Sequence, residues 1–429
     1  GCGNVKDCKF YDKTVSEEEL EVSTPTDESY RIPWTGNSFG LADLNFLTAS
    51  SKTILIGITG VASAGKTTFL VTEALKIHDK KVLITTFTDE NVREIKKKFI
   101  EINGFIPNNI HIKGWFSFLL QECLKPYQCV LNNDLFGKKI GFNYWTDGQS
   151  GLKYFWKGRP IYWAEKDFLN HFFDSNLSIY SDKISKFIVR IYEKDNQLIF
   201  QRLAKIYGCI FIDEIQDLAG YDLDIVRNIY SSIQNVIAVG DPRQTTYSTH
   251  HSQKYKKYSE GKVRNFFCEH LGELCEIDEI TLSKSHRNEQ IVCAISSQLF
   301  PELTPSVSCE CCDDSHIEHL GAFYVPESKH LKYLEQYNPI QLRWDSRNSK
   351  VNPKFIAMNI GSSKGLTLDR VLLYPTKNMI DWLNDENTQL VQQTQSKFYV
   401  GLTRAKYSLG ILVADNELSK LRQIIPIYE

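Results

Sequence analysis

The chain has 429 residues, of which 42% are hydrophobic and 24% are charged, a composition typical of a soluble globular protein. The length is too great for one ordinary core and suits two or three domains. No run of 18 or more apolar residues is present, which excludes a membrane span, and we expect no membrane partner. The net charge of −2 argues against a globally basic nucleic-acid binder, although local basic patches remain compatible with it.

Eleven cysteines, an odd number at irregular spacing, do not form the pattern of a disulfide framework, so we expect a reducing, cytoplasmic location. One short stretch combines thiols and imidazoles, namely Cys309, Cys311, Cys312, His316 and His319. These are zinc-ligand types without the usual paired spacing, so a metal site and a loop with solvent-facing thiols both stay open. Because the chain begins with glycine, we expect its native N-terminus and any targeting signal to lie outside it.

Residues 1–40 are polar, partly acidic and aperiodic, which predicts a loosely packed N-terminal extension. From residue 53 onward, apolar runs that are typical of strands alternate with helical segments. The expected strands are 53–59, 81–88 and 108–114, and the expected helices are 68–81, 89–102 and 115–123. Asp89 is the expected N-cap of the second of these helices.

The alternation stops between residues 125 and 205, where aromatic residues and lysines precede a helical stretch at 182–207. We interpret 125–205 as an accessory subdomain inserted into a first α/β unit, which is formed by 41–124 and 206–280. The aromatic residues of this subdomain could either stack on nucleic-acid bases or pack inside the protein. They are Tyr154, Phe155, Trp156, Tyr162 and Trp163. The alternation resumes with expected strands at 209–214, 235–241 and 279–283.

Residues 281–429 repeat the alternating pattern and predict a second α/β unit. The expected helices are 288–300 and 389–406, and the expected strands are 320–325, 339–344, 355–360, 370–375 and 408–414. Strands that alternate with helices predict parallel sheets covered on both faces. The expected fold is therefore α/β, with two nucleotide-binding-type units and a cleft between them.

The stretch GVASAGKT fits the pattern G-x-x-x-x-G-K-[ST] and lies between an expected strand and an expected helix. Small residues let backbone N–H groups wrap phosphates, and the helix N-terminus adds a positive dipole. Lys66 would reach the β- and γ-phosphates, and Thr67 would hold Mg²⁺. The residues of this loop that we expect to contact the nucleotide are Gly60, Ala62, Ser63, Ala64, Gly65, Lys66, Thr67 and Thr68. A glycine-rich turn with an incidental lysine is the alternative.

Asp213 and Glu214 follow an expected buried strand, CIFI, at the strand end where ligands bind in open α/β sheets. An aspartate there can hold the Mg²⁺ that bridges the phosphates, so Asp213 and Thr67 are the expected metal ligands. The adjacent Glu214 can activate the attacking water. An acidic pair at the end of a strand is common, and the pair alone is weak support.

The longer string Asp213-Glu214-Ile215-Gln216-Asp217 resembles the second motif of superfamily-1 helicases of the UvrD/Rep type. Other segments resemble further motifs of that family in the family's order, namely motif Ia at 85–95, III at 239–247, IV at 282–288, V at 362–373 and VI at 399–406. The resemblance extends from Gly60 to Lys406 and implies two RecA-like P-loop NTPase lobes, with the inserted subdomain in the first.

The resemblance also implies roles for residues of both lobes. Gln244 would sense the γ-phosphate and couple it to the nucleic-acid cleft. Arg287 and Arg404 would contact the phosphates from the second lobe as arginine fingers, and Gly365 of motif V would add a nucleotide contact. The catalytic set is therefore Lys66, Asp213, Glu214, Gln244, Arg287 and Arg404, with ATP and Mg²⁺ as cofactors.

The chain departs from the family pattern at several positions. Motif V begins Asn359-Ile360-Gly361 and has Thr367 in place of a glutamate, and motif IV reads Ser285-His286-Arg287. The aromatic-Arg-Gly element that normally follows motif III is replaced by STHHSQKYKKY. No glutamine between Trp34 and Gly60 is available to read adenine.

The resemblance implies an ATPase that translocates along single-stranded DNA with 3′→5′ polarity, and strand separation is the weaker expectation. A compact chain of this kind also resembles helicase-like subunits of bacterial anti-phage systems such as Gabija. On that alternative, the protein is a nucleic-acid- or nucleotide-sensing ATPase subunit with a nuclease or other defence-complex partner. A P-loop phosphotransferase is disfavoured, because it does not explain a second α/β unit that carries two arginines.

Overall fold

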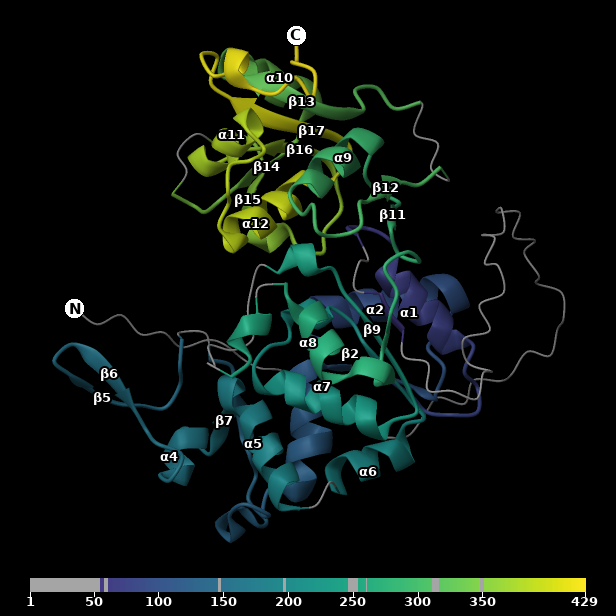
Figure 1. Cartoon of the computed structure of the whole chain (residues 1–429), viewed down its shortest axis with the longest axis vertical. Helices are drawn as coiled ribbons and strands as arrows, with labels where there is room; N and C mark the ends of the chain where they lie inside the picture. Colours follow the sequence, from purple (N-terminus) through teal and green to yellow (C-terminus); the bar gives the residue numbers. More distant parts are fainter. Residues whose placement is uncertain are drawn as a thin grey trace, which may run out of the picture. The chain divides into compact units, whose positions relative to one another are not determined.

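The computed structural model describes residues 55–57, 61–145, 148–195, 198–245, 254–259, 261–310, 316–347 and 351–429. The expected N-terminal extension, Gly60, Cys311, Cys312 and the segment that replaces the aromatic-Arg-Gly element, up to residue 253, lie outside these residues. Residues 47–429 form one compact unit, which contains two parallel sheets (Figure 1).

The first sheet has six strands in the order β10-β1-β9-β8-β2-β3, and every neighbouring pair is parallel. The strands are β1 (Leu55–Gly57), β2 (Val82–Thr86), β3 (Ile110–Gly114), β8 (Cys209–Ile212), β9 (Asn235–Val239) and β10 (Glu276–Ile277). Because all strands run the same way, the carboxyl ends of β1, β2, β8 and β9 meet at one edge. This edge carries the glycine loop and the acidic string.

Alternate side chains of these strands enter two separate cores, as the period of a strand requires. Val82 and Ile84 of β2 pack on one face with helices α1 (Lys66–Leu75) and α2 (Asp89–Asn103). Leu83 enters the opposite core, which the helices of residues 115–270 build. Those helices are α3 (Trp115–Phe118), a π-helical turn (Leu119–Leu124), α5 (Ser181–Lys194), α6 (Leu198–Ile206), α7 (Tyr221–Ser232) and α8 (Val263–His270). Both faces of the sheet are therefore covered.

The helices of the stretch 125–205 share a continuous core with the first sheet. Ile184 and Phe187 of α5 are fully buried beside residues of β8 and α7. The carboxylate of Asp222 in α7 accepts hydrogen bonds from the indole Nε1 of Trp115 at 2.9 Å and from the hydroxyl of Ser185. These buried bonds fix α5 to the sheet layer, so this part of the chain is packed as core and not as an appendage.

The rest of that stretch consists of small elements. They are β4 (Gly141–Asn143) paired in parallel with β7 (Ser178–Tyr180), the antiparallel hairpin β5 (Leu152–Trp156) and β6 (Arg159–Tyr162), and α4 (Phe168–Phe172). The hairpin is a two-stranded sheet of its own. The domain boundaries expected from the sequence stay a prediction.

The second sheet has five parallel strands in the order β13-β17-β16-β14-β15. The strands are β13 (Gly321–Pro326), β14 (Ile340–Arg343), β15 (Ala357–Asn359), β16 (Leu368–Leu373) and β17 (Ala405–Val413), and the helices are α9 (Gln290–Gln298), α10 (His330–Tyr337), α11 (Lys377–Asn384) and α12 (Gln392–Leu402). Val371 and Leu373 face one core and Leu372 faces the other, so both faces of this sheet are covered as well.

Most expected elements are confirmed, and five expectations need correction. The helix expected at 68–81 begins at Lys66 and ends at Leu75, and the helix expected at 389–406 ends at Leu402 because β17 begins at Ala405. The N-cap of α2 is Thr88, whose hydroxyl accepts from the amide of Asn91 at 3.1 Å, and Asp89 is the first helical residue. Residues 279–283 form no strand, because the short strand ends before them at Ile277. The helix expected at 115–123 changes from α to π geometry after Phe118. In the described part of the chain, no helix is long and apolar enough to cross a bilayer.

Candidate nucleotide-binding site

The loop before α1 has the geometry of a phosphate cradle. Ser63 and Gly65 adopt left-handed conformations, with φ values of 60° and 74°, and Gly65 is the N-cap of α1. Glycine reaches this conformation without steric strain, which explains its place immediately before the helix. Lys66 begins the helix, and its ammonium group donates to the carbonyl of Val61 at 3.3 Å. The amides of the first helical turn and this ammonium group therefore lie together around the loop.

Residues that follow the first sheet hold this loop in place. The amide of Val61 donates to the carbonyl of Leu282 at 3.1 Å. The hydroxyl of Ser285 donates to the carbonyl of Ala62 at 2.8 Å, and the Tyr399 hydroxyl of α12 accepts from the Ala62 amide at 3.3 Å. Segments expected as motifs IV and VI thus fix the conformation of the glycine loop.

Two carboxyl groups with opposite electrostatic environments follow β8. Asp213 is buried, and its amide donates to the carbonyl of Thr85 at 2.8 Å. Burial and the adjacent Glu214 raise the pKa of Asp213. Burial also acts on Glu214, but the positive charges of Lys364 and Lys66 hold its pKa below the usual value. Glu214 is therefore ionised at neutral pH, and Asp213 would lose its proton when a cation binds.

A chain of hydrogen bonds links Glu214 to the second sheet. The Gln216 side chain donates to Glu214 and accepts from the amide of Asp241 at 3.1 Å. The amide nitrogen of Gln244 donates to the Asp241 carboxylate at 2.8 Å, and its oxygen accepts from the guanidinium of Arg404 at 3.4 Å. The expected γ-phosphate sensor thus connects the acidic string with the expected arginine finger.

The two arginines lie near each other, and their described hydrogen bonds all go to uncharged acceptors. Arg404 is buried and donates to the carbonyl of Val400 at 3.2 Å, besides its bond to Gln244. Arg287 donates to the hydroxyl of Thr367 at 2.6 Å and to the carbonyl of Thr403 at 3.0 Å. Within the described residues, neither guanidinium forms a salt bridge with a carboxylate. Burial lowers the pKa of both, and the charge of Arg404 further lowers the pKa of Arg287.

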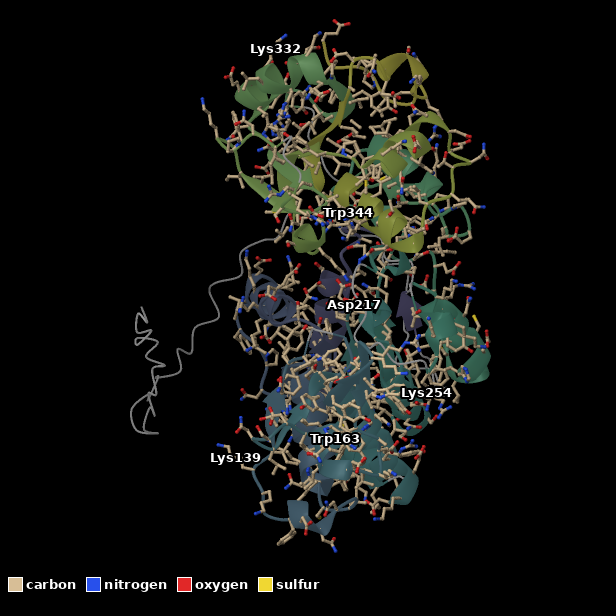
Figure 2. The ribbon with its side chains drawn as sticks, turned by 90° about the vertical axis from the view of Figure 1, so that its left-hand side faces the viewer. Lys139, Trp163, Asp217, Lys254, Lys332 and Trp344 are labelled. Carbon is tan, nitrogen blue, oxygen red and sulfur yellow. The ribbon has the colours of Figure 1, made fainter. Side chains whose placement is uncertain are left out.

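A buried ion pair that the sequence reasoning missed joins the two sheets. The ammonium group of Lys364 lies 2.7 and 2.8 Å from the two carboxylate oxygens of Asp217, and 3.8 Å from Glu214. Both residues of the pair lie inside recognised motifs. The sequence signal available for this contact was therefore their opposite charge and the position of each in its motif. Figure 2 labels Asp217, which follows β8 of the first sheet, whereas Lys364 lies between β15 and β16 of the second.

The remaining expected contacts have different surroundings. Thr67 is half-buried at the start of α1, and Thr68 is exposed. A Cβ at Gly365 would lie 4.0 Å from the side-chain oxygen of Asn91, so Gly365 lies beside α2. Glu94, a further acidic group of α2, was not expected. Its pKa is raised by burial and by the charge of Glu214, so it lies close to the candidate site.

Of the two histidines of the Cys/His stretch, His316 is exposed and His319 is half-buried. His319 stacks between the rings of Phe323 and Tyr337, at centroid distances of 4.0 and 3.9 Å, and its Nε2 lies 3.1 Å from the Tyr333 hydroxyl. Burial lowers its pKa to about 4. Among the described residues, no group of three or more potential ligands could hold a metal ion. Two cysteines of the stretch lie outside those residues, so the zinc prediction is not decided.

The arrangement defines a class of protein. A phosphate-binding loop between a strand and a helix of a parallel sheet, with buried carboxyl groups after another strand of that sheet, is the site of a P-loop nucleoside triphosphatase. Residues 46–250 match the model of an AAA domain. Residues 199–413, half of the chain, match the model of the viral superfamily 1 RNA helicase core domain. The chain belongs to this helicase family, whose members hydrolyse nucleoside triphosphates.

Solved structures that resemble this chain include two of arterivirus nonstructural protein 10, a helicase, one of them in complex with DNA, and one of the PRRSV helicase. The identities are 15%, 14% and 14%, and the TM-scores are 0.37, 0.39 and 0.37. The matches cover 86%, 84% and 86% of this chain but only 62%, 61% and 54% of the helicases. The chain thus spans less than two thirds of their length. The search of curated proteins gives no match.

Proposed function

We propose that the two parallel sheets are RecA-like lobes and that the protein is an ATP-driven translocase on single-stranded nucleic acid. One observation carries the proposal. The guanidinium group of Arg404 lies at the end of a hydrogen-bond chain that begins at Glu214, and the positive charge of Arg287 lies close to it. Neither arginine has a carboxylate partner among the described residues. Two neighbouring cations, the buried Arg404 and the half-buried Arg287, suit a polyanion such as a triphosphate, because its charge would relieve their mutual repulsion.

The residues of the first sheet would bind and activate the nucleotide. The amides at the start of α1 and the ammonium group of Lys66 would hold the phosphates. Thr67 and Asp213 would hold Mg²⁺, which neutralises phosphate charge when it is bound. Glu214, kept ionised by the nearby lysines, would orient the attacking water and accept its proton. These roles rest on the motif resemblance and on the burial and charge described above.

The residues of the second sheet would make hydrolysis depend on contact between the lobes. Arg404 would stabilise charge that develops on the transferring phosphoryl group, and its bond to Gln244 would report the state of the γ-phosphate to the first lobe. Contacts that form and break between two lobes provide the two-state element that a motor requires. The pair Lys364–Asp217 and the chain through Gln244 are the described contacts that would change.

The finer assignments follow from the UvrD/Rep resemblance of the motifs. They are single-stranded DNA as the track and movement from 3′ to 5′. A cytoplasmic location is proposed separately, from the odd number and irregular spacing of the cysteines. RNA is the competing track, because the matched family model is named for RNA helicases.

A second candidate is a sensor ATPase of an anti-phage complex that acts with a nuclease partner. It is favoured by the absence from the sequence of the aromatic-Arg-Gly element after motif III, which would normally stack on a base.

The deciding experiment is steady-state ATP hydrolysis with no nucleic acid, with single-stranded DNA and with single-stranded RNA of the same sequence. Lys66→Ala serves as the blank. We expect strong stimulation by at least one of the two polymers, and their ranking assigns the track. Turnover that is unaffected by both polymers would contradict the motor and support the sensor subunit. No turnover above the blank would contradict both functions.

A further inference from the structure

The hairpin β5–β6 has a large apolar surface that no other described part of the chain covers. All five residues of β5 are exposed, and the exposed fractions of Tyr154, Phe155 and Trp156 are 51%, 66% and 58%. Successive side chains of a strand point to opposite faces, so aromatic rings lie on both faces of the hairpin. In Figure 1 the hairpin extends beyond α4, and in Figure 2 its side of the molecule faces the viewer, with Trp163 labelled.

The turn gives the hairpin a defined backbone conformation, although no other described part of the chain covers its aromatic rings. Lys157 and Gly158 form its two-residue turn, and both have positive φ values, 49° and 75°. This is the turn geometry that matches the twist of two antiparallel strands. A two-stranded hairpin is marginal in water, and large exposed aromatic rings add nothing to its stability. Contiguous exposed apolar surface instead marks a binding site.

The charge of the hairpin points to the chemistry of its partner. Three basic side chains lie among the aromatic rings, Lys153, Lys157 and Arg159, and no acidic residue occurs between Leu152 and Trp163. The ammonium group of Lys157 lies 4.8 Å from the centroid of the Trp156 ring. Single-stranded nucleic acid is bound without sequence preference by two components. Aromatic rings stack on the bases, and basic side chains bind the phosphates.

We propose that the β5–β6 hairpin is a second contact for single-stranded nucleic acid, in which Tyr154, Phe155 and Trp156 stack on unpaired bases and the basic residues hold the phosphates. The proposal rests on the proposed function, because it takes the polymer of the motor as the occupant. It adds a binding element that none of the helicase motifs contains. The hairpin would retain the strand while the contacts between the lobes change during turnover.

The test measures the affinity of the full chain for a fluorescent single-stranded oligonucleotide, using whichever of DNA or RNA stimulates hydrolysis. Trp156→Ala should weaken binding about tenfold or more, because one stacked base is lost. Arg159→Ala should reduce the slope of log affinity against log salt by about one, because one phosphate contact is lost. The matched control is Phe136→Ala, since Phe136 is 79% exposed and lies outside the hairpin. This control should bind like the unchanged chain.

The outcomes separate this inference from the proposed function. If Trp156→Ala binds as tightly as Phe136→Ala while nucleic acid still stimulates hydrolysis, the hairpin inference is wrong and the motor stands. If nucleic acid neither binds nor stimulates the unchanged chain, the motor itself fails.

Two further measurements test other occupants. Binding of the unchanged chain, but not of Trp156→Ala, to vesicles with anionic lipid would assign the hairpin to a membrane surface and overturn the proposal. Self-association that Trp156→Ala abolishes would assign it to a second copy of the chain, with the same result. The exposed position of Trp156 allows each variant to fold, which circular dichroism verifies.

Discussion

The nucleotide-binding site and the β5–β6 hairpin are built on opposite principles. At the site, polar and charged groups are buried or half-buried and bond to one another, as Gln244 bonds to Asp241 and Arg404. On the hairpin, apolar rings are exposed and few contacts hold them. Substitution at the site removes interactions that burial makes strong, whereas substitution on the hairpin leaves the fold intact. We therefore expect nucleotide hydrolysis and nucleic-acid binding by the hairpin to be separable by substitution. Five predictions test that separation.

The largest effect is expected at the general base. Glu214→Gln should abolish hydrolysis while nucleotide binding persists, because the amide keeps the shape of the side chain but cannot accept a proton. Lys66→Ala should lose both binding and hydrolysis. Single-turnover hydrolysis and binding of a fluorescent ATP analogue measure the two quantities. Measurable turnover in Glu214→Gln would remove this residue as the activator of water.

The next effect is expected at the two arginines. Arg287→Ala and Arg404→Ala should each lower kcat by about 10³-fold or more, the range of arginine fingers. Lysine at either position should not restore the rate, since it lacks the planar fork of guanidinium. Unchanged rates in both alanine variants would mean that the second sheet does not contribute to the nucleotide site.

The buried ion pair should matter for folding stability. Lys364→Met leaves the Asp217 carboxylate buried beside Glu214 without its cation, which should cost about 3–5 kcal/mol of unfolding free energy. The double variant with Asp217→Asn should recover part of that loss. The matched control is Lys332→Met on the exposed surface, expected to change stability by less than about 0.5 kcal/mol. Equal urea midpoints for Lys364→Met and Lys332→Met would contradict the role of the pair.

A smaller effect is expected from pH. Because burial and Glu214 raise the pKa of Asp213, its protonated form is favoured more than in water, and Mg²⁺ must displace the proton. Mg²⁺-dependent nucleotide binding should therefore tighten as pH rises and should release a proton. Calorimetry in two buffers of different ionisation enthalpy measures this release. Asp213→Asn should remove the pH dependence together with Mg²⁺ binding. An equal binding enthalpy in both buffers would refute the assignment.

The smallest effect is expected on the stability of hairpin variants. Phe155→Ala and Trp156→Ala remove rings that are mostly exposed, so the free energy of unfolding should change by less than about 0.5 kcal/mol. Basal ATP hydrolysis should also be unchanged. Thermal unfolding and hydrolysis without nucleic acid provide the comparison. A large loss of stability would mean that the rings pack against something, and the contrast with the buried site would fail.

The sequence alone determined most local elements and predicted the class of the site, a P-loop nucleoside triphosphatase. Continuous runs of apolar residues placed β2, β8 and β16, because a strand of a parallel sheet that is covered on both faces buries its side chains on both sides. The pattern around Lys66 predicted a loop before a helix, because only small residues allow that turn. The order of the motifs predicted a superfamily-1 helicase, which the match of residues 199–413 confirms, whereas the UvrD/Rep type stays a prediction.

Tertiary structure decided what lies next to what. The buried pair of Asp217 and Lys364 joins residues 147 positions apart, and no local pattern encodes a contact at that distance. The packing of α5 into the core of the first sheet was equally hidden, because an amphipathic helix does not specify which surface it covers. The exposure of Trp156 reversed the usual fate of such a ring, because burial depends on what the rest of the fold brings near it. Composition and period report local preference, whereas burial and charge pairing arise only when distant segments meet.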